Sequence, residues 1–120
     1  MVNSYKDLIV WQKSISLVRE IYLITKNFPK DEKFGLISQL RRASVAIPSN
    51  IAEGYGRKTK NDRMQFYIIA YSSALEIETQ LIISIQLGFL SSKNAEKALS
   101  VLLEVLKMLN SLTSGSRSNT

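Results

Sequence analysis

Residues 37–57 read ISQLRRASVAIPSNIAEGYGR, and this stretch decides the fold of the chain. At 100° per residue, a helix over this stretch has one apolar side and an opposite side of small and charged residues. The apolar side contains Leu36, Leu40, Ala43, Ile47 and Ile51, and the opposite side contains Ser38, Arg42, Val45, Ser49, Ala52 and Glu53. Because small side chains let another helix approach closely, we expect this helix to have a second contact surface besides the core.

Pro48 lies in the middle of this pattern. Proline has no N–H to donate to the carbonyl of Ser44 and its ring crowds that turn, so a continuous helix bends there at a cost of about 3 kcal/mol. The alternative is a break, with Pro48 in the first turn of a new helix, where proline is tolerated. Because Gly54 and Gly56 follow closely and supply the freedom of a helix exit, we favour one bent helix over a break.

Apolar periodicity predicts four helices and no strand. They are expected at about 7–26, from between 31 and 35 to 53, from a cap at Thr59 to 87, and from 91 or 92 onward. Short connections between them are typical of an antiparallel up-and-down four-helix bundle. We expect one domain over 1–112 and a disordered tail over 113–120, which has no apolar residue to bury.

The first and third helices differ in how their apolar residues are distributed. In the first helix, the stripe of Leu8, Trp11, Ile15, Val18 and Tyr22 is expected to face the core, with Trp11 as an anchor. The third helix is apolar on more than one side, whereas a helix in a monomeric bundle needs one stripe. We therefore expect a homo-oligomer whose interface uses the second helix and the region of Phe66, Ile69, Ile77 and Leu81.

The composition excludes several kinds of chemistry. The 120 residues include no cysteine and no histidine, so there is no disulfide, thiolate nucleophile, Cys/His zinc site or Ser-His-Asp triad. We expect no metal, no cofactor and no enzymatic activity; a metal-dependent nuclease is the least favoured alternative. No signal peptide is apparent and no stretch resembles a membrane span, so a cytoplasmic protein without a membrane partner is expected.

A net charge of +6 and a pI near 9.7 suggest a polyanionic partner. Residues 41–63 include six cationic and two anionic side chains, so this segment has a net charge of +4. The candidate nucleic-acid contacts are Arg41, Arg42, Arg57, Lys58, Lys60 and Arg63, with Tyr55 available for base stacking. We expect both parts of this set at the same end of the bundle. Ordinary solvated charge is the alternative, and the sequence leaves both interpretations open.

Several polar residues are expected to form a structural network. Glu78 shares the register of Tyr71, Leu81 and other apolar residues, so it needs a partner if that side is interior. The expected network consists of Gln39, Asn50, Glu53 and Glu78, with Arg41 and Arg42 as further candidates for pairing. Glu76 and Glu78 lie about 200° apart on a helix, so they do not jointly hold a metal ion.

Three strings carry a family resemblance: DLIVWQKS (7–14), FPKDEKFGLISQLRRA (28–43) and IPSNIAEG (47–54). With Arg57, Phe66, Ala70, Ser73 and the segment 76–81, they make the chain closely similar to the four-helix bundle proteins encoded in bacterial 23S ribosomal RNA intervening sequences, often labelled S23 ribosomal proteins. Ile77 departs conservatively from an expected leucine. The resemblance implies a ring, usually a homopentamer, and a relation to basic accessory proteins of diversity-generating retroelements, which associate with nucleic acid and reverse transcriptase. It implies no catalytic residues.

Two functions follow from these patterns. The leading hypothesis is a non-enzymatic homo-oligomer that binds the RNA or DNA backbone through its basic residues. The alternative is a protein-interaction scaffold whose basic surface contacts an acidic protein partner. Nucleic-acid binding at moderate salt distinguishes the two. The resemblance separately implies a reverse transcriptase as a protein partner.

Overall fold

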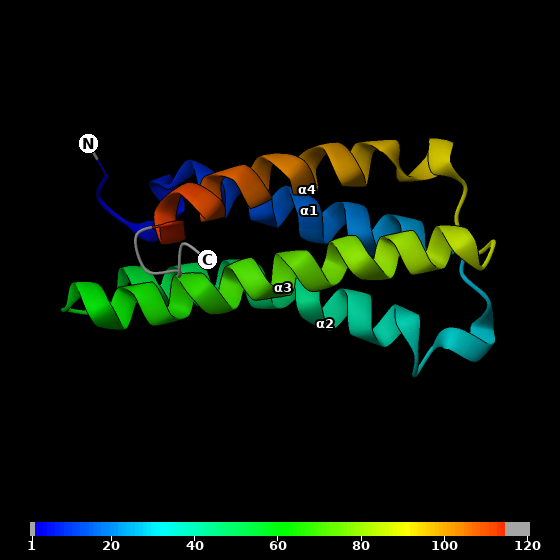
Figure 1. Ribbon diagram of the computed structural model, residues 1–120, viewed down its shortest axis with the longest axis horizontal. Coiled ribbons are helices and arrows are strands. Elements are labelled where there is room, and N and C mark those ends of the chain that lie inside the picture. Colours follow the sequence, from blue (N-terminus) through cyan, green and yellow to red (C-terminus); the bar gives the residue numbers. More distant parts are fainter. Residues whose placement is uncertain (1, 115–120) are drawn as a thin grey trace.

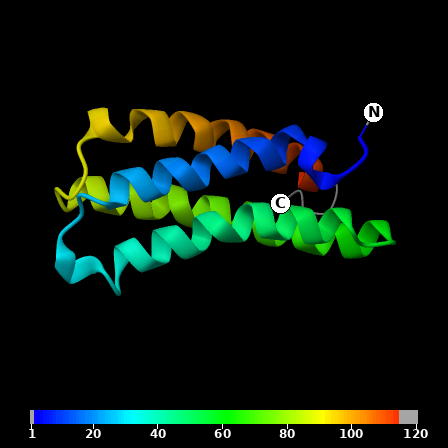
Figure 2. The ribbon, with the colours of Figure 1, turned by 180° about the vertical axis from the view of Figure 1, so that it is seen from behind.

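The computed structural model describes residues 2–114 as a bundle of four long helices. Successive helices run in opposite directions, with α3 and α4 on one broad side (Figure 1) and α1 and α2 on the other (Figure 2). Over residues 2–114 there is no strand, so the prediction of an all-α chain with four helices is confirmed. The elements are η1 (Tyr5–Asp7), α1 (Ile9–Thr25), η2 (Lys30–Glu32), α2 (Leu36–Tyr55), α3 (Lys60–Gln86) and α4 (Ser92–Thr113), where η marks a short 3-10 helix.

Short polar side chains begin two of these elements. The Oγ1 of Thr59 accepts a hydrogen bond from the backbone N–H of Asp62 at 3.1 Å, which confirms the predicted cap of α3. Ser4 and Asp7 form a capping box, but the box begins η1 rather than α1. As a result α1 begins at Ile9, slightly later than the sequence predicts.

The second helix is continuous from Leu36 to Tyr55, with Pro48 inside it. The alternative of a break at Pro48 is therefore wrong, whereas the bend stays a prediction. Pro48 is buried, and the hydroxyl of the neighbouring buried Ser44 donates to the carbonyl of Arg41 at 2.8 Å. Ile47 and Ile51 on either side of it are buried as well, and the packing of this part of α2 in the bundle offsets the hydrogen bond that proline removes.

The glycines after this helix have a different role from the one expected. Gly54 is buried inside α2, and Gly56 caps the helix with an ordinary right-handed φ of −79°. Among the described residues only Gly88, after α3, has a positive φ, at 79°. Gly54 is instead required by close helix packing, because a Cβ there would lie 2.7 Å from Cε1 of Tyr67 and 3.1 Å from Cβ of Phe66.

The end of α4 lies beyond the predicted domain boundary at 112. Thr113 is the last residue of α4, is fully buried, and donates its hydroxyl to the carbonyl of Leu109 at 2.8 Å. The assignment of Thr113 to a disordered tail is therefore wrong, because a threonine can bury its methyl group while its hydroxyl bonds within the helix. The remainder of the predicted tail, residues 115–120, lies outside the described residues.

The core lies between the four helices, and α1 contributes a different side to it from the predicted one. The fully buried side chains include Leu17, Ile21, Leu40, Ile47, Ile51, Ile77, Leu81, Leu102 and Leu109. On α1 the buried side is Val10, Ser14, Leu17, Ile21 and Thr25. The predicted stripe lies at the border of this side: Leu8 and Trp11 are half-buried and pack against the core, so Trp11 is an anchor, whereas Tyr22 is exposed and its place in the core is wrong. Because α1 has two adjacent apolar stripes, periodicity does not choose between them.

The third helix is apolar on its outer side as well as its inner side. Leu75 is 40% exposed and Ile82 is 54% exposed, although both belong to a helix that packs against α2 and α4. An 18-residue window of α3 has a mean hydropathy of 1.3, so by length and composition the helix could cross a membrane. In the bundle, 33% of that window is buried. The prediction of a broad apolar surface on α3 is confirmed, but it is wrong for Ile77 and Leu81, which are fully buried in the core and not available to another copy. The statement that no stretch resembles a membrane span is wrong for α3 by length and composition. A core helix passes the same test, so the absence of a membrane partner stays a prediction.

Two glycine substitutions test the close packing of α2 on α3. We expect Gly54→Ala to lower the free energy of unfolding by roughly 1–3 kcal/mol, because the added methyl overlaps Tyr67 and Phe66. Gly56→Ala is the matched control, since its Cβ would lie 3.6 Å from the nearest atom and its φ suits alanine. It should be neutral or stabilising by up to about 1 kcal/mol. Urea titration measures both, and equal stabilities for the two variants would contradict the close approach.

Candidate nucleic-acid interface

The candidate phosphate-binding residues fall into two groups at different places along the bundle. Arg41 and Arg42 lie in the first third of α2, whereas Arg57 and Lys58 follow its last turn. Arg42 lies thirteen residues before Tyr55, the last residue of α2, which corresponds to a rise of about 20 Å before the chain reaches Arg57. Figure 1 shows the start of α2 and the α2–α3 connection at opposite ends of the molecule. The expectation that all six cations share one end is therefore wrong.

The group at the connection between α2 and α3 is called the basic loop here and consists of Arg57, Lys58, Lys60 and Arg63. Arg63 donates from Nη1 to the carbonyl of Arg57 at 2.9 Å and to that of Lys58 at 3.2 Å. The guanidinium of Arg63 therefore holds the loop backbone in place while its positive charge stays at the surface. These two bonds, together with the Thr59 cap, give the connection a defined shape before any ligand binds.

The other three cations of the basic loop differ in their contacts. Arg57 lies 3.9 Å from a carboxylate oxygen of Glu53 and stacks over the ring of Phe66 at 4.6 Å. Both partners of that ion pair are about half exposed, so the pair contributes little stability and leaves Arg57 able to contact another anion. Lys58 and Lys60 are exposed and form no ion pair with any residue of 2–114.

Tyr55 lies beside this loop at the end of α2 but is half-buried. Burial raises the pKa of the Tyr67 hydroxyl above its ordinary value of 10.0; the nearby Arg63 opposes this rise, and Tyr55 adds to it. Tyr55 therefore lies close to Tyr67 and offers only part of its ring to a stacked base. The proposal of base stacking by Tyr55 stays a prediction.

Arg41 and Arg42, the cations near the start of α2, differ in their contacts. Arg41 donates from Nε to the hydroxyl of Thr25 at 3.0 Å, and its guanidinium lies 4.5 Å from the centre of the Tyr22 ring. Arg41 thus fastens α2 to α1. Arg42 is exposed and has no hydrogen bond or ion pair within residues 2–114. Both arginines border a groove with Phe34, which is 89% exposed and which the sequence reasoning did not single out.

The expected polar network is replaced by another one centred on Gln80. Its Nε2 donates to Oε1 of Gln39 at 3.0 Å and to Oε1 of Glu76 at 3.2 Å, joining α2 to α3. Its own Oε1 is buried and has no hydrogen-bond partner among residues 2–114. Sequence reasoning missed Gln80 as a central residue, although its spacing of three from Ile77 places it on the core side of α3.

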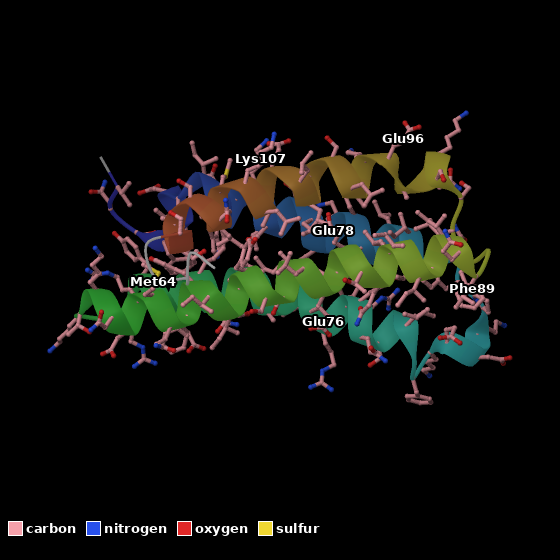
Figure 3. The ribbon with its side chains drawn as sticks, in the orientation of Figure 1. Met64, Glu76, Glu78, Phe89, Glu96 and Lys107 are labelled. Carbon is pink, nitrogen blue, oxygen red and sulfur yellow. The ribbon has the colours of Figure 1, made fainter. Side chains whose placement is uncertain are left out.

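The remaining members of the predicted network do not meet one another. Asn50 donates to the carbonyl of Ala46 in its own helix at 2.7 Å, and Glu53 lies next to Arg57. Glu78 is half-buried and has no hydrogen bond or ion pair within residues 2–114. In Figure 3 Glu76 and Glu78 lie on opposite flanks of α3, as their spacing of two predicts. Within the same range, no group of three or more Asp, Glu, His or Cys side chains is placed to hold a metal ion.

The geometry is that of a small all-α bundle with a pre-shaped basic loop at one end. The family described as 23S rRNA-intervening sequence protein matches residues 6–111, and the chain belongs to that family. A solved structure of a protein with unknown function from the S23 ribosomal protein family of Bacteroides thetaiotaomicron is 24% identical, with a TM-score of 0.78, and the match covers 88% of this chain and 98% of that one. That likeness supports the fold. No curated protein matches the chain.

Replacing Gln80 tests the cost of its unpaired oxygen. We expect Gln80→Met to keep or raise the free energy of unfolding, by up to about 1 kcal/mol, because Gln39 and Glu76 are exposed and regain water when the amide is removed. Urea titration of the variant measures this change. A loss greater than about 1 kcal/mol would mean that the amide of Gln80 is satisfied in solution and stabilises the α2–α3 contact.

Proposed function

We propose that this protein binds the backbone of RNA or DNA through the basic loop, without enzymatic activity, and acts as a homo-oligomer. The observation that carries the proposal is the exposure of Lys58 and Lys60 and the absence of ion pairs to them within residues 2–114. Both ammonium groups are exposed, unpaired within residues 2–114, and held next to Arg57 and Arg63 on a fixed turn. Four cations within seven residues, against Asp62 and the neighbouring Glu53, form a compact positive site.

Contacts of this kind suit phosphate groups rather than bases. A lysine ammonium is a compact charge without the planar shape that reads a base edge, and phosphate contacts carry no sequence information. Each contact releases condensed counterions, so the affinity depends steeply on salt. In an oligomer, several copies of the loop contact one strand and multiply a modest single-site affinity.

The homo-oligomer is supported by apolar surfaces on both broad sides of the bundle. Tyr22 and Val45 are exposed on the α1–α2 side, and Leu75, Ile82 and Leu103 are exposed elsewhere on the bundle, on α3 and α4. A monomeric four-helix bundle needs one apolar stripe per helix, and wider apolar surfaces are typical of protein contacts. A ring of five copies is the count that the family resemblance implies.

The first prediction of this proposal concerns salt. We expect binding of a single-stranded RNA to weaken with salt, with a log–log slope of about −0.7 for each phosphate contacted. The variant Arg57→Ala/Lys58→Ala/Lys60→Ala should weaken binding similarly across sequences and flatten this slope. The matched control is Lys30→Ala/Lys93→Ala, which removes two exposed cations from η2 and the start of α4. Fluorescence anisotropy between about 50 and 200 mM salt measures both.

Two outcomes would contradict nucleic-acid binding through the basic loop. One is the absence of any measurable binding by the unaltered protein at about 50 mM salt. The other is an unchanged affinity and slope in the triple variant. The absence of binding favours the second candidate, an acidic protein partner, since the same exposed lysines suit carboxylates on a protein surface. An unchanged triple variant would place the nucleic-acid contacts outside the basic loop.

The second prediction concerns mass. We expect sedimentation equilibrium at micromolar concentration to give a multiple of the 13.5 kDa chain mass, with five as the multiple that the resemblance implies. A single 13.5 kDa species would contradict the homo-oligomer, whereas a different closed number would correct only the count.

A further inference from the structure

Arg42 and Glu78 are charged side chains that have no hydrogen-bond or ion-pair partner in the described part of their own chain. Arg42 is exposed on the outer side of α2, beside Ser38 and Val45. Glu78 is half-buried on α3, on the flank that faces α4, as Figure 3 shows. Neither has a hydrogen bond or ion pair within residues 2–114. A carboxylate that is partly withdrawn from water is unfavourable unless a cation or donor compensates it.

The two residues lie at nearly the same height along the bundle. Gln39 and Gln80 are joined by a hydrogen bond of 3.0 Å, so they mark equal heights on the antiparallel helices α2 and α3. Arg42 is three residues after Gln39, and Glu78 is two residues before Gln80. At 1.5 Å per residue, their heights differ by about 1.5 Å.

Within one chain, however, they face different neighbours. Arg42 lies at the outer edge of α2, where it borders the α1–α2 groove with Tyr22 and Val45 and also a hollow toward α3 with Ser73 and Glu76. Glu78 belongs to the side that α3 and α4 form, which faces the viewer in Figure 1. Glu78 lies four residues before the exposed Ile82, so each of the two charged residues adjoins exposed apolar side chains.

Opposite faces of one molecule that complement each other in charge and apolarity favour head-to-tail association. If the copies of a ring are related by rotation about an axis parallel to the helices, the rotation does not change the position of a residue along that axis. Residues at equal heights on the two faces then meet at the contact between copies. We propose that Glu78 of each copy forms an ion pair with Arg42 of the next copy and thereby sets the register of this contact. The inference rests on the proposed homo-oligomer, and its occupant is a second copy of this chain.

Competing partners on the same faces are already engaged. Arg41 is bonded to Thr25 and stacked on Tyr22, and Lys33 lies over the ring of Phe34 at 5.6 Å. On α3, Glu76 accepts a hydrogen bond from Gln80 and lies on the flank away from Glu78. Among Lys33, Arg41 and Arg42 of the segment around the start of α2, Arg42 is thus the cation without a hydrogen bond, ion pair or ring contact within residues 2–114.

Charge reversal tests the pair directly. Arg42→Glu and Glu78→Arg, each alone, place like charges together at every contact, and each should weaken assembly by on the order of tenfold or more. The double variant Arg42→Glu/Glu78→Arg restores opposite charges, and we expect it to recover most of the assembly. Glu96→Arg is the matched control, because Glu96 is exposed on the side of α4 away from α3 (Figure 3) and its reversal should leave the mass unchanged.

Sedimentation velocity measures the assembly, and far-ultraviolet circular dichroism verifies that each variant keeps its helices. Wild-type mass in both single variants, or a folded double variant that assembles no better than the single ones, would overturn the ion pair while leaving the homo-oligomer intact. A monomeric unaltered protein is a different result, since it would overturn the homo-oligomer itself. RNA binding by the basic loop is scored separately, by the salt slope of the unaltered protein.

Discussion

The close approach of α2 and α3 at Gly54 is the constraint on which the rest of the structure depends. At this point the backbone of α2 lies directly against the side chains of Tyr67 and Phe66, where no Cβ fits. The approach lets α2 turn into α3 through the short segment between Tyr55 and Lys60. The basic loop owes its position to this packing, because a more distant α3 would require a longer connection.

The cations of this protein differ mainly in whether they are bonded within the chain or are available to bind another molecule. Arg41 and Arg63 have the same side chain as Arg42 and Arg57, yet Arg41 fastens α2 to α1 and Arg63 holds two loop carbonyls. Guanidinium groups are suited to such fixed, directional bonds. Lys58 and Lys60 form no ion pair within residues 2–114. A polyanion would thus meet a surface whose arginines maintain its shape and whose lysines supply much of its attraction.

The two broad sides of the bundle carry a second kind of complementarity. One apolar surface contains Arg42 and the other contains Glu78, and neither residue has an ion-pair partner within residues 2–114. Covering either surface buries apolar area, but an apolar partner alone would leave the charged group buried without a counterion. Their equal height follows from the antiparallel pairing of α2 with α3, which the Gln39–Gln80 bond fixes. Register in the proposed ring is therefore a consequence of register within one chain.

The sequence by itself determined the number and type of elements. The stripe of Leu40, Ile47 and Ile51 predicted a helix continuous through Pro48, and the cap at Thr59 was predicted from spacing. Local chemistry suffices for these features, because periodicity and capping act within a few residues. The sequence also predicted that α3 is apolar on more than one side.

Only the tertiary structure decided which side of α1 is buried, because its two apolar stripes have the same spacing and the choice depends on how α1 rotates against α2 and α4. It also separated Arg42 from the basic loop by most of the length of α2, and replaced the expected network around Glu78 by one around Gln80. Partners of long polar side chains depend on the relative height of two helices, and that height is set by packing between segments far apart in the chain.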